Sequence, residues 1–180
     1  MLDIIIGNAF SVVAMGADTI ASSRKTSKGV LLVQCVSQLA MGLGALVLKG
    51  YSAVVQNAVS ILRNLRAATN KGGKWLEWVF LALAVSLGLY FNNLGLVGTL
   101  PVVANVGYSL TVYFFGDDEI KLKFAYLISN VLFATFNAVI LSFVGTACNI
   151  FVAIATAVFL VKDHKRRKQE RQSNPEQKGS

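Results

Sequence analysis

The chain has 180 residues, of which 54% are hydrophobic and only 14% are charged, and its formal net charge is +8. Soluble domains carry roughly 25% charged residues. The composition therefore excludes an ordinary soluble domain and predicts an integral membrane protein whose main solvent is lipid.

Seven apolar segments are predicted as transmembrane helices, because a crossing needs about 20 mostly apolar residues. In chain order they are residues 2–22, 30–48, 50–65, 76–91, 94–115, 122–140 and 141–161. The first has Asp3 where a signal peptide would have a basic residue, so we expect a retained helix. The last two segments run together and would make a helix of about 60 Å, twice the hydrocarbon thickness. We therefore predict a turn near Leu141–Ser142.

The basic residues are distributed unevenly over the predicted loops. With seven crossings, all 17 lysines and arginines except Lys49 fall on one side of the membrane. Since positive charge stays cytoplasmic, the N-terminus is predicted outside and the C-terminus inside. Residues 162–180 contain almost no apolar side chain, so we predict a disordered cytoplasmic tail. Its basic cluster is expected to contact anionic lipid rather than nucleic acid.

Few residues suggest chemistry outside the membrane. Cys35 and Cys148 both fall within predicted helices, where packing is expected rather than a disulfide. Trp75 and Trp78 stand where the fourth helix would leave the cytoplasmic face, so membrane anchoring is expected, with ligand stacking as the alternative. The sequence contains no metal-ligand spacing, no nucleophile–base pair and no phosphate-binding loop. We therefore expect no enzyme, no metal and no cofactor.

The first three predicted helices align with the last three. An offset of 91 pairs Gly7 with Gly98, Val12 with Val103 and Gly16 with Gly107; an offset of 92 pairs Ser37 with Ser129, Gln38 with Asn130, Val47 with Val139 and Asn57 with Asn149. Each unit crosses the membrane three times, an odd number, so two parallel units need one further crossing helix between them, as in one class of transporters. We predict a first unit at 1–70, a linker helix at 71–93, a second unit at 94–161 and the tail at 162–180.

The stretch GYSAVVQNAVSILRNL at 50–65, which follows a glycine-rich second segment, resembles the YgjV-type family of bacterial inner-membrane proteins. The resemblance covers most of the chain outside the tail. That family is similar in layout to the SWEET and PQ-loop (MtN3-like) transporters, which have a 3+1+3 arrangement. In SWEETs, asparagines on the third and seventh helices face each other across the substrate pocket, and Asn57 and Asn149 match those positions. The PQ-type proline is present as Pro101, whereas Phe10 takes its place in the first unit.

Polar side chains at bilayer depth indicate where a solute could bind. Asn57 and Asn149 are predicted about 10 and about 12 Å into their helices, and each amide offers two donors and an acceptor. We expect them to line a pocket for an uncharged solute; the alternative is an interhelical bond that only stabilises the bundle. Gln38, Asn105 and Asn130 either line the same path or join helices.

Two further sets of residues bear on mechanism. Gly98, Pro101 and Gly107 could let the fifth helix bend, with Gly16 as a counterpart on the first; close helix packing is the alternative. Asp18 lies at a depth like that of Arg63 and Arg66, so a structural ion pair with one of them is expected. A proton-coupling role for Asp18 is the other reading.

The sequence supports two functional hypotheses. The first is a multi-pass transporter in a bacterial inner membrane, which moves a small uncharged polar solute by rocking one unit against the other. The resemblance implies a sugar, with a vitamin-type nucleoside as the alternative substrate. The second is a non-transporting membrane protein that binds a partner subunit or lipid. A hydrated cavity at the asparagines would favour the first, and tightly bonded amides the second. An oligomer is compatible with either.

Overall fold

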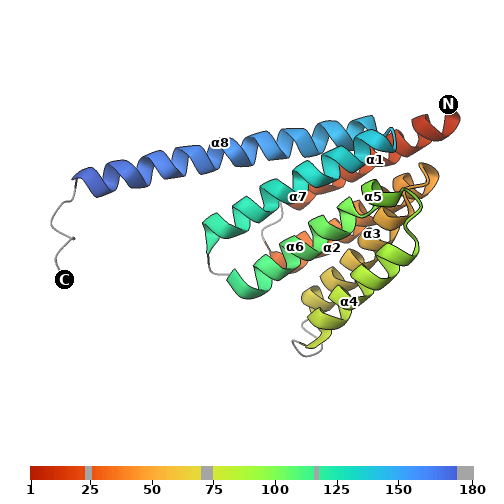
Figure 1. Ribbon diagram of the computed structural model, residues 1–180, viewed down its shortest axis with the longest axis horizontal. Helices are drawn as coiled ribbons and strands as arrows, with labels where there is room; N and C mark the ends of the chain where they lie inside the picture. The colour runs from red at the N-terminus through yellow and green to blue at the C-terminus, as the bar shows by residue number, and fades with distance from the viewer. Residues whose placement is uncertain (23–25, 70–74, 116–117, 174–180) are drawn as a thin grey trace.

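The computed structural model of the protein describes residues 1–22, 26–69, 75–115 and 118–173. The regular structure of these residues is all helical, which confirms the predicted class (Figure 1). The helices are α1 (Leu2–Ser22), α2 (Ser27–Val47), α3 (Tyr51–Thr69), α4 (Trp75–Tyr90), α5 (Gly95–Gly98), α6 (Leu100–Phe115), α7 (Glu119–Val139) and α8 (Phe143–Ser173).

The helix bounds follow the predicted segments closely up to the last helix. The turn predicted near Leu141–Ser142 is confirmed, since α7 ends at Val139 and α8 begins at Phe143. The predicted fifth segment is split into the short α5 and the longer α6, with the break at Thr99, two residues before Pro101. Proline lacks the N–H that would continue the helical ladder, which accounts for a break at this place.

The predicted disorder of the tail needs correction over residues 162–173. Here α8 continues without interruption to Ser173 and extends well past the other helices (Figure 1). Extending an existing helix costs little, because each added residue contributes one hydrogen bond. Lys, Arg, Gln and Glu, which dominate this stretch, are also good helix formers. Residues 174–180 of the predicted tail lie outside the described part of the chain.

Within the described part of the chain, five spans are long and apolar enough to cross a membrane: those of α1, α2, α5 with α6, α7 and α8. The apolar α4 is shorter, with 16 residues. The helix α3 is not among these spans and carries Gln56, Asn57, Arg63, Asn64 and Arg66. The chain is therefore a multi-pass membrane protein, and α3 is the helix whose polar side chains most need partners inside the bundle.

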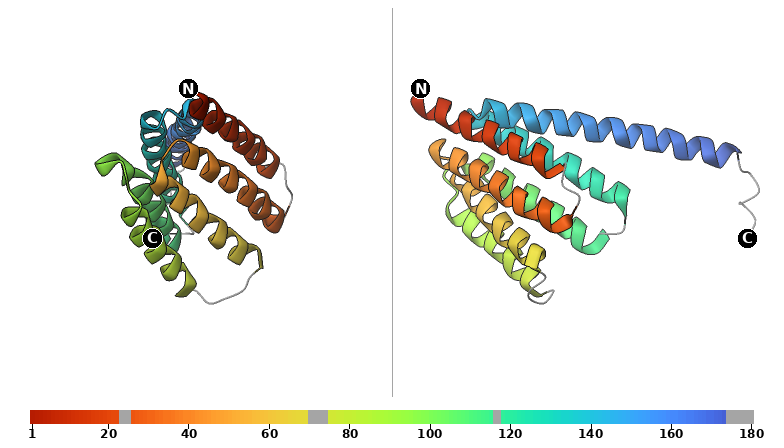
Figure 2. Two further views of the ribbon diagram at one scale, coloured as in Figure 1. Left: turned by 90° about the vertical axis from the view of Figure 1, so that its right-hand side faces the viewer. Right: turned by 180° about the vertical axis from the view of Figure 1, so that it is seen from behind.

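The helices pack in a ring. Each long helix contacts its neighbour in sequence, α4 contacts α6, and α8 returns to contact α1; α3 also touches α6 directly. Figure 2 shows α1, α2, α3 and α4 in this order as one curved layer in both views. Most of the buried apolar residues are alanines, and Phe136, which is 0% exposed, is the largest side chain in the core. Small residues allow close approach of helices in a membrane.

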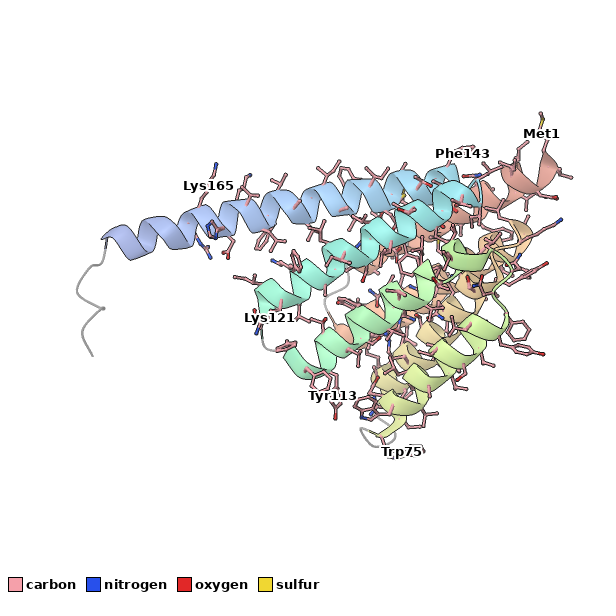
Figure 3. All side chains as sticks on the ribbon, viewed as in Figure 1. Met1, Trp75, Tyr113, Lys121, Phe143 and Lys165 are labelled. Carbon is pink, nitrogen blue, oxygen red and sulfur yellow. The ribbon has the colours of Figure 1, made fainter. Side chains whose placement is uncertain are left out.

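The bundle has two unlike ends, seen in Figure 3. Met1 and Phe143 lie at one, called here the N-terminal end; Trp75, Tyr113 and Lys121 lie at the other, called the basic end. Among the described basic side chains, Lys49 alone belongs to the N-terminal end. Arg24, Lys25, Lys71 and Lys74, which also contribute to the predicted charge asymmetry, lie outside the described residues.

The turns after α2 and α7 have the same backbone geometry 92 residues apart. Lys49 has φ 60° and Leu141 has φ 61°, a left-handed conformation that is uncommon outside glycine. Each turn is closed by a bond from the next residue to the helix: Gly50 N donates to Ala45 O at 2.8 Å, and Ser142 N donates to Asn137 O at 2.9 Å. This is the Schellman closure of a helix C-terminus.

The starts of the same two helices also correspond. Thr26 caps α2 and accepts a hydrogen bond from Gly29 N. Asp118 caps α7 and accepts from Ile120 N and Lys121 N. Residues 26 and 118 are again 92 apart, so α2 and α7 begin and end at matching positions. Side-chain oxygens at this place satisfy backbone donors that have no partner within the helix.

Candidate functional site

A polar joint fastens α1 to the turn between α7 and α8 at the N-terminal end. The Asn8 side chain donates from Nδ2 to Leu141 O at 3.0 Å and accepts from Val144 N at 2.9 Å. The hydroxyls of Ser11 and Ser142 lie 3.2 Å apart and share a hydrogen bond. Val144 belongs to the first turn of α8, whose backbone donors lack partners within the helix, so Asn8 supplies one. This joint was not predicted from the sequence, because none of its members forms a recognisable motif.

A small cavity of about 40 Å³ adjoins the joint and contains the first predicted site residue. Asn57 lines it together with Ser11, Asn137 and Ser142. The Asn57 amide donates from Nδ2 to Ala53 O of its own helix at 2.9 Å. One water needs about 10–15 Å³ of such space, so the cavity has room for only a few waters.

Asn149 occupies the equivalent position on α8 and behaves in the same way. Its amide donates from Nδ2 to Gly145 O at 3.0 Å, four residues back along α8, and its side chain is half-buried. It is not one of the residues that line the cavity beside Asn57. The structure therefore gives the two asparagines matching local bonds and does not bring them to one cavity.

The other predicted path residues separate into two groups. Asn130 is buried and donates from Nδ2 to Tyr126 O at 2.8 Å, also within its own helix, and Gln38 is half-buried on α2. Asn105 differs from both, because it bonds across helices. Its Nδ2 donates to Gln56 Oε1 at 2.8 Å, and Gln56 Nε2 donates to Ala84 O of α4 at 2.8 Å.

Arg63 extends this polar chain along α3. Its Nη1 donates to Ser109 Oγ at 2.9 Å and to Asn105 Oδ1 at 3.5 Å, both on α6. The chain from α4 through Gln56, Asn105 and Arg63 to Ser109 thus joins three helices by side-chain bonds. Gln56 is only 2% exposed, and its two hydrogen bonds satisfy the requirement that a buried polar side chain has partners.

A cavity of about 500 Å³ lies beside this chain, between α3, α4 and α6. Ligand sites typically measure about 300–1,000 Å³. Its walls combine the polar side chains of Arg63, Asn105 and Ser109 with apolar and aromatic ones such as Leu81 and Tyr113. It shares none of its lining residues with the cavity beside Asn57. Among the described residues it is the best candidate binding site, because polar and charged side chains line a cavity of ligand size.

The ion pair predicted for Asp18 is wrong. Arg66 pairs with Glu77 of α4, and Arg63 bonds to α6. Asp18 instead lies beside the hydroxyl of Ser37 on α2. The reason is the packing order: α1 lies between α2 and α8, and α3 faces α2, α4 and α6. Equal depth in the membrane does not place two residues on facing helices.

The predicted hinge residues occupy different surroundings. A Cβ on Gly98 would clash with Asn92 Oδ1, so close packing explains this glycine. Among the described residues, none lies within 4 Å of such a Cβ on Gly16 or Gly107, so packing there does not explain these glycines. Pro101 is fully buried just after the break between α5 and α6. A bending role for these positions stays a prediction.

The two tryptophans, for which the sequence predicted one shared role, lie in different surroundings. Trp75 is 64% exposed, as expected of an anchor, whereas Trp78 lines the large cavity and packs edge-on against Tyr113 with ring centroids 5.1 Å apart. Cys35 and Cys148 are both free thiols. Among the described residues, no group of His, Cys, Asp or Glu is arranged to hold a metal ion.

Comparison with known proteins bears on the family and the membrane. The sequence model of Imp-YgjV, described as a bacterial inner membrane protein, matches residues 5–167. This match confirms the resemblance drawn from residues 50–65 and the predicted location in a bacterial inner membrane. No curated protein and no solved structure matches the chain.

Proposed function

The chain belongs to the Imp-YgjV family of bacterial inner membrane proteins, and we propose that it transports a small polar solute by alternating access. In this proposal α1–α3 and α6–α8 are two parallel three-helix units, and α4 is the linker helix that crosses between them. The N-terminal end faces outward and the basic end faces the cytoplasm, as the distribution of lysine and arginine favours.

The observation that carries the proposal is the correspondence between α2–α3 and α7–α8. Equivalent turns with φ 60° at Lys49 and φ 61° at Leu141, and equivalent caps at Thr26 and Asp118, support a parallel repeat at an offset of 92. Parallel repeats of this kind occur in one class of secondary transporters, with substrate bound between the repeats near the midplane.

The contact between the two units supports movement of one against the other. At the N-terminal end, α1 meets the second unit through Asn8 and the Ser11–Ser142 pair. Elsewhere α3 meets α6 through Gln56, Arg63 and their bonds to Asn105. Side-chain hydrogen bonds between membrane helices contribute only about 0.6 kcal/mol each on average, so these bonds are separable at low cost. Phe136 and Ile140 also pack against Ala45 and Ala53 of the first unit, and this apolar contact would have to slide.

The solute is proposed to be uncharged and sugar-like, or a vitamin-type nucleoside, and to bind near Asn57 once the joint at the N-terminal end opens. In the present conformation the cavity beside Asn57 holds about 40 Å³, too little for a sugar. This closed arrangement is also what the second candidate function requires, a non-transporting protein that binds a partner subunit or lipid. The two differ in whether the N-terminal end opens.

The test is to lock that end. In a Cys35→Ala/Cys148→Ala background, Ser11→Cys and Ser142→Cys would place two thiols where the hydroxyls are now 3.2 Å apart, close enough for a disulfide. The wild type is first reconstituted in liposomes and tested for uptake of labelled sugars, nucleosides and vitamins. For any compound taken up, oxidation of the double variant should abolish uptake, and reduction should restore it.

Matched controls make the outcome specific. Each single cysteine variant should transport with or without oxidant, and Asn57→Ala/Asn149→Ala should lose uptake while it still folds. A locked protein that transports normally would exclude alternating access at this joint. If the wild type takes up no compound of the panel, the non-transporting function becomes the better account.

A further inference from the structure

The large cavity between α3, α4 and α6 has features of a binding site of its own. It runs along α6 from Tyr113 to Asn105, eight residues or about 12 Å. Trp78 and Tyr113, at the basic end, are each 46% exposed, so the cavity reaches the surface there. It shares no lining residue with the cavity beside Asn57, so a ligand here would occupy a site other than the proposed solute site.

The cavity carries an excess positive charge. Its charged lining residues are Arg63, Arg66 and Glu77, and Glu77 is engaged by Arg66. The bonds of Arg63 go to the neutral groups Asn105 Oδ1 and Ser109 Oγ. A cation among membrane helices is costly unless an anion or strong dipoles compensate it. A bound anion would supply the missing negative charge.

The guanidinium of Arg63 also has N–H donors that its two hydrogen bonds do not use. Both of its hydrogen bonds leave from Nη1, and within the described residues Nη2 and Nε have no hydrogen-bond partner. A guanidinium presents five N–H groups in a planar fork that matches the two oxygens of a carboxylate or phosphate. Because Ser109 and Asn105 hold one side of the fork, its orientation is set before a ligand arrives.

The remaining walls suit an apolar body. Phe80, Leu81 and Leu110 line the cavity with Trp78, which packs edge-on against Tyr113. Such a lining favours an organic anion over a bare inorganic one, since the apolar part of the ligand would cover these side chains. An organic acid from the cytoplasm and the headgroup region of an anionic lipid share this chemistry.

We propose that the cavity between α3, α4 and α6 binds an organic anion, with a carboxylate or phosphate on Arg63 and an apolar body against Trp78 and Leu81. Arg63 is the residue that confers selectivity for the charge. Trp78 reports on occupancy, because its ring forms part of the wall.

The experiment uses the full chain with Trp75→Phe, which leaves Trp78 as the single remaining tryptophan of the two in the sequence. The protein is placed in nanodiscs of phosphatidylcholine and titrated with hexanoate, while Trp78 emission is recorded. Hexanamide, which has the same chain without the charge, is the matched ligand control. A second series uses nanodiscs that contain phosphatidylglycerol. A saturable change with hexanoate indicates a soluble organic acid, and a change with phosphatidylglycerol alone indicates a lipid.

Variants then test the role of Arg63. Arg63→Gln should weaken the response to the anion about tenfold or more, as expected for loss of a hydrogen bond to a charged group. Lys162→Gln, which removes an exposed charge outside the cavity, should leave binding unchanged. If Arg63→Gln does not fold, Arg63→Lys keeps the charge without the fork and should show intermediate affinity. Equal responses to hexanoate and hexanamide with no effect of phosphatidylglycerol, or an anion response that keeps wild-type affinity in Arg63→Gln or in Arg63→Lys, would overturn the proposal.

Discussion

The helix pairs α2–α3 and α7–α8 share a backbone plan and differ in chemistry. Their caps and turns lie 92 residues apart with matching geometry. Yet Gln56 and Arg63, which join α3 to α4 and α6, have Cys148 and Ala155 at the corresponding places on α8. Matching turns and caps thus accompany different interhelical contacts, because the amide and guanidinium that join α3 to its neighbours have no such counterpart at these two places on α8.

The largest expected effect is a loss of stability on replacing Gln56, compared with its counterpart Cys148. Gln56→Ala removes two interhelical hydrogen bonds and leaves a void at a side chain that is 2% exposed. The free energy of unfolding should fall by about 3 kcal/mol. Cys148→Ala alters a half-buried thiol and should cost less than about 1 kcal/mol. Unfolding by SDS titration, followed by circular dichroism, measures both; equal losses would contradict the proposed asymmetry.

A smaller effect is expected where the two turns exchange residues. A Cβ on Gly50 would lie 2.9 Å from Phe136 Cζ, so Gly50→Ser should overpack the core and reduce stability by about 2 kcal/mol. The reciprocal Ser142→Gly removes the bond to Ser11 and should cost about 1 kcal/mol. The same SDS titration compares them. A larger loss for Ser142→Gly than for Gly50→Ser would show that hydrogen bonding, and not close packing, distinguishes the turns.

The smallest effect concerns the two helix caps and depends on pH. Hydrogen bonds from Lys121, through its backbone N–H and its side chain, lower the pKa of the Asp118 carboxyl. A group with a lowered folded pKa stabilises the fold above its unfolded pKa, about 3.9, and this stabilisation is lost as the pH falls through the folded pKa. Asp118→Asn keeps a cap without the charge. The wild type should therefore lose more thermal stability than the variant below about pH 4.

The control for this comparison is the other cap. Thr26, which caps α2 through a hydroxyl, does not titrate in this range, so Thr26→Asn should leave the pH dependence of melting unchanged. Melting curves of the three proteins between neutral and acidic pH, followed by circular dichroism, give the result. If Asp118→Asn and the wild type lose stability in parallel, the pH dependence arises elsewhere in the chain.

Much of the architecture was determined by the sequence alone. The helical class, the first helix at 2–22 and the turn near Leu141–Ser142 followed from apolar segment length and local composition, because lipid forces each crossing to satisfy its own backbone. The family was indicated by the resemblance of residues 50–65 to known inner-membrane proteins. The correspondence between Asn57 and Asn149 could also be seen in the sequence, because it depends only on the offset of 92 residues between two aligned helices.

The contacts between helices were decided only by the tertiary structure. The sequence alone predicted an ion pair between Asp18 and an arginine of α3. In the packed bundle Arg66 pairs with Glu77, and Arg63 donates a hydrogen bond to Ser109. The cavity beside Arg63 and the joint at Asn8 depend on which face of each helix turns toward which neighbour. Depth and hydropathy are properties of a single helix, whereas rotation and neighbours follow from packing against the others.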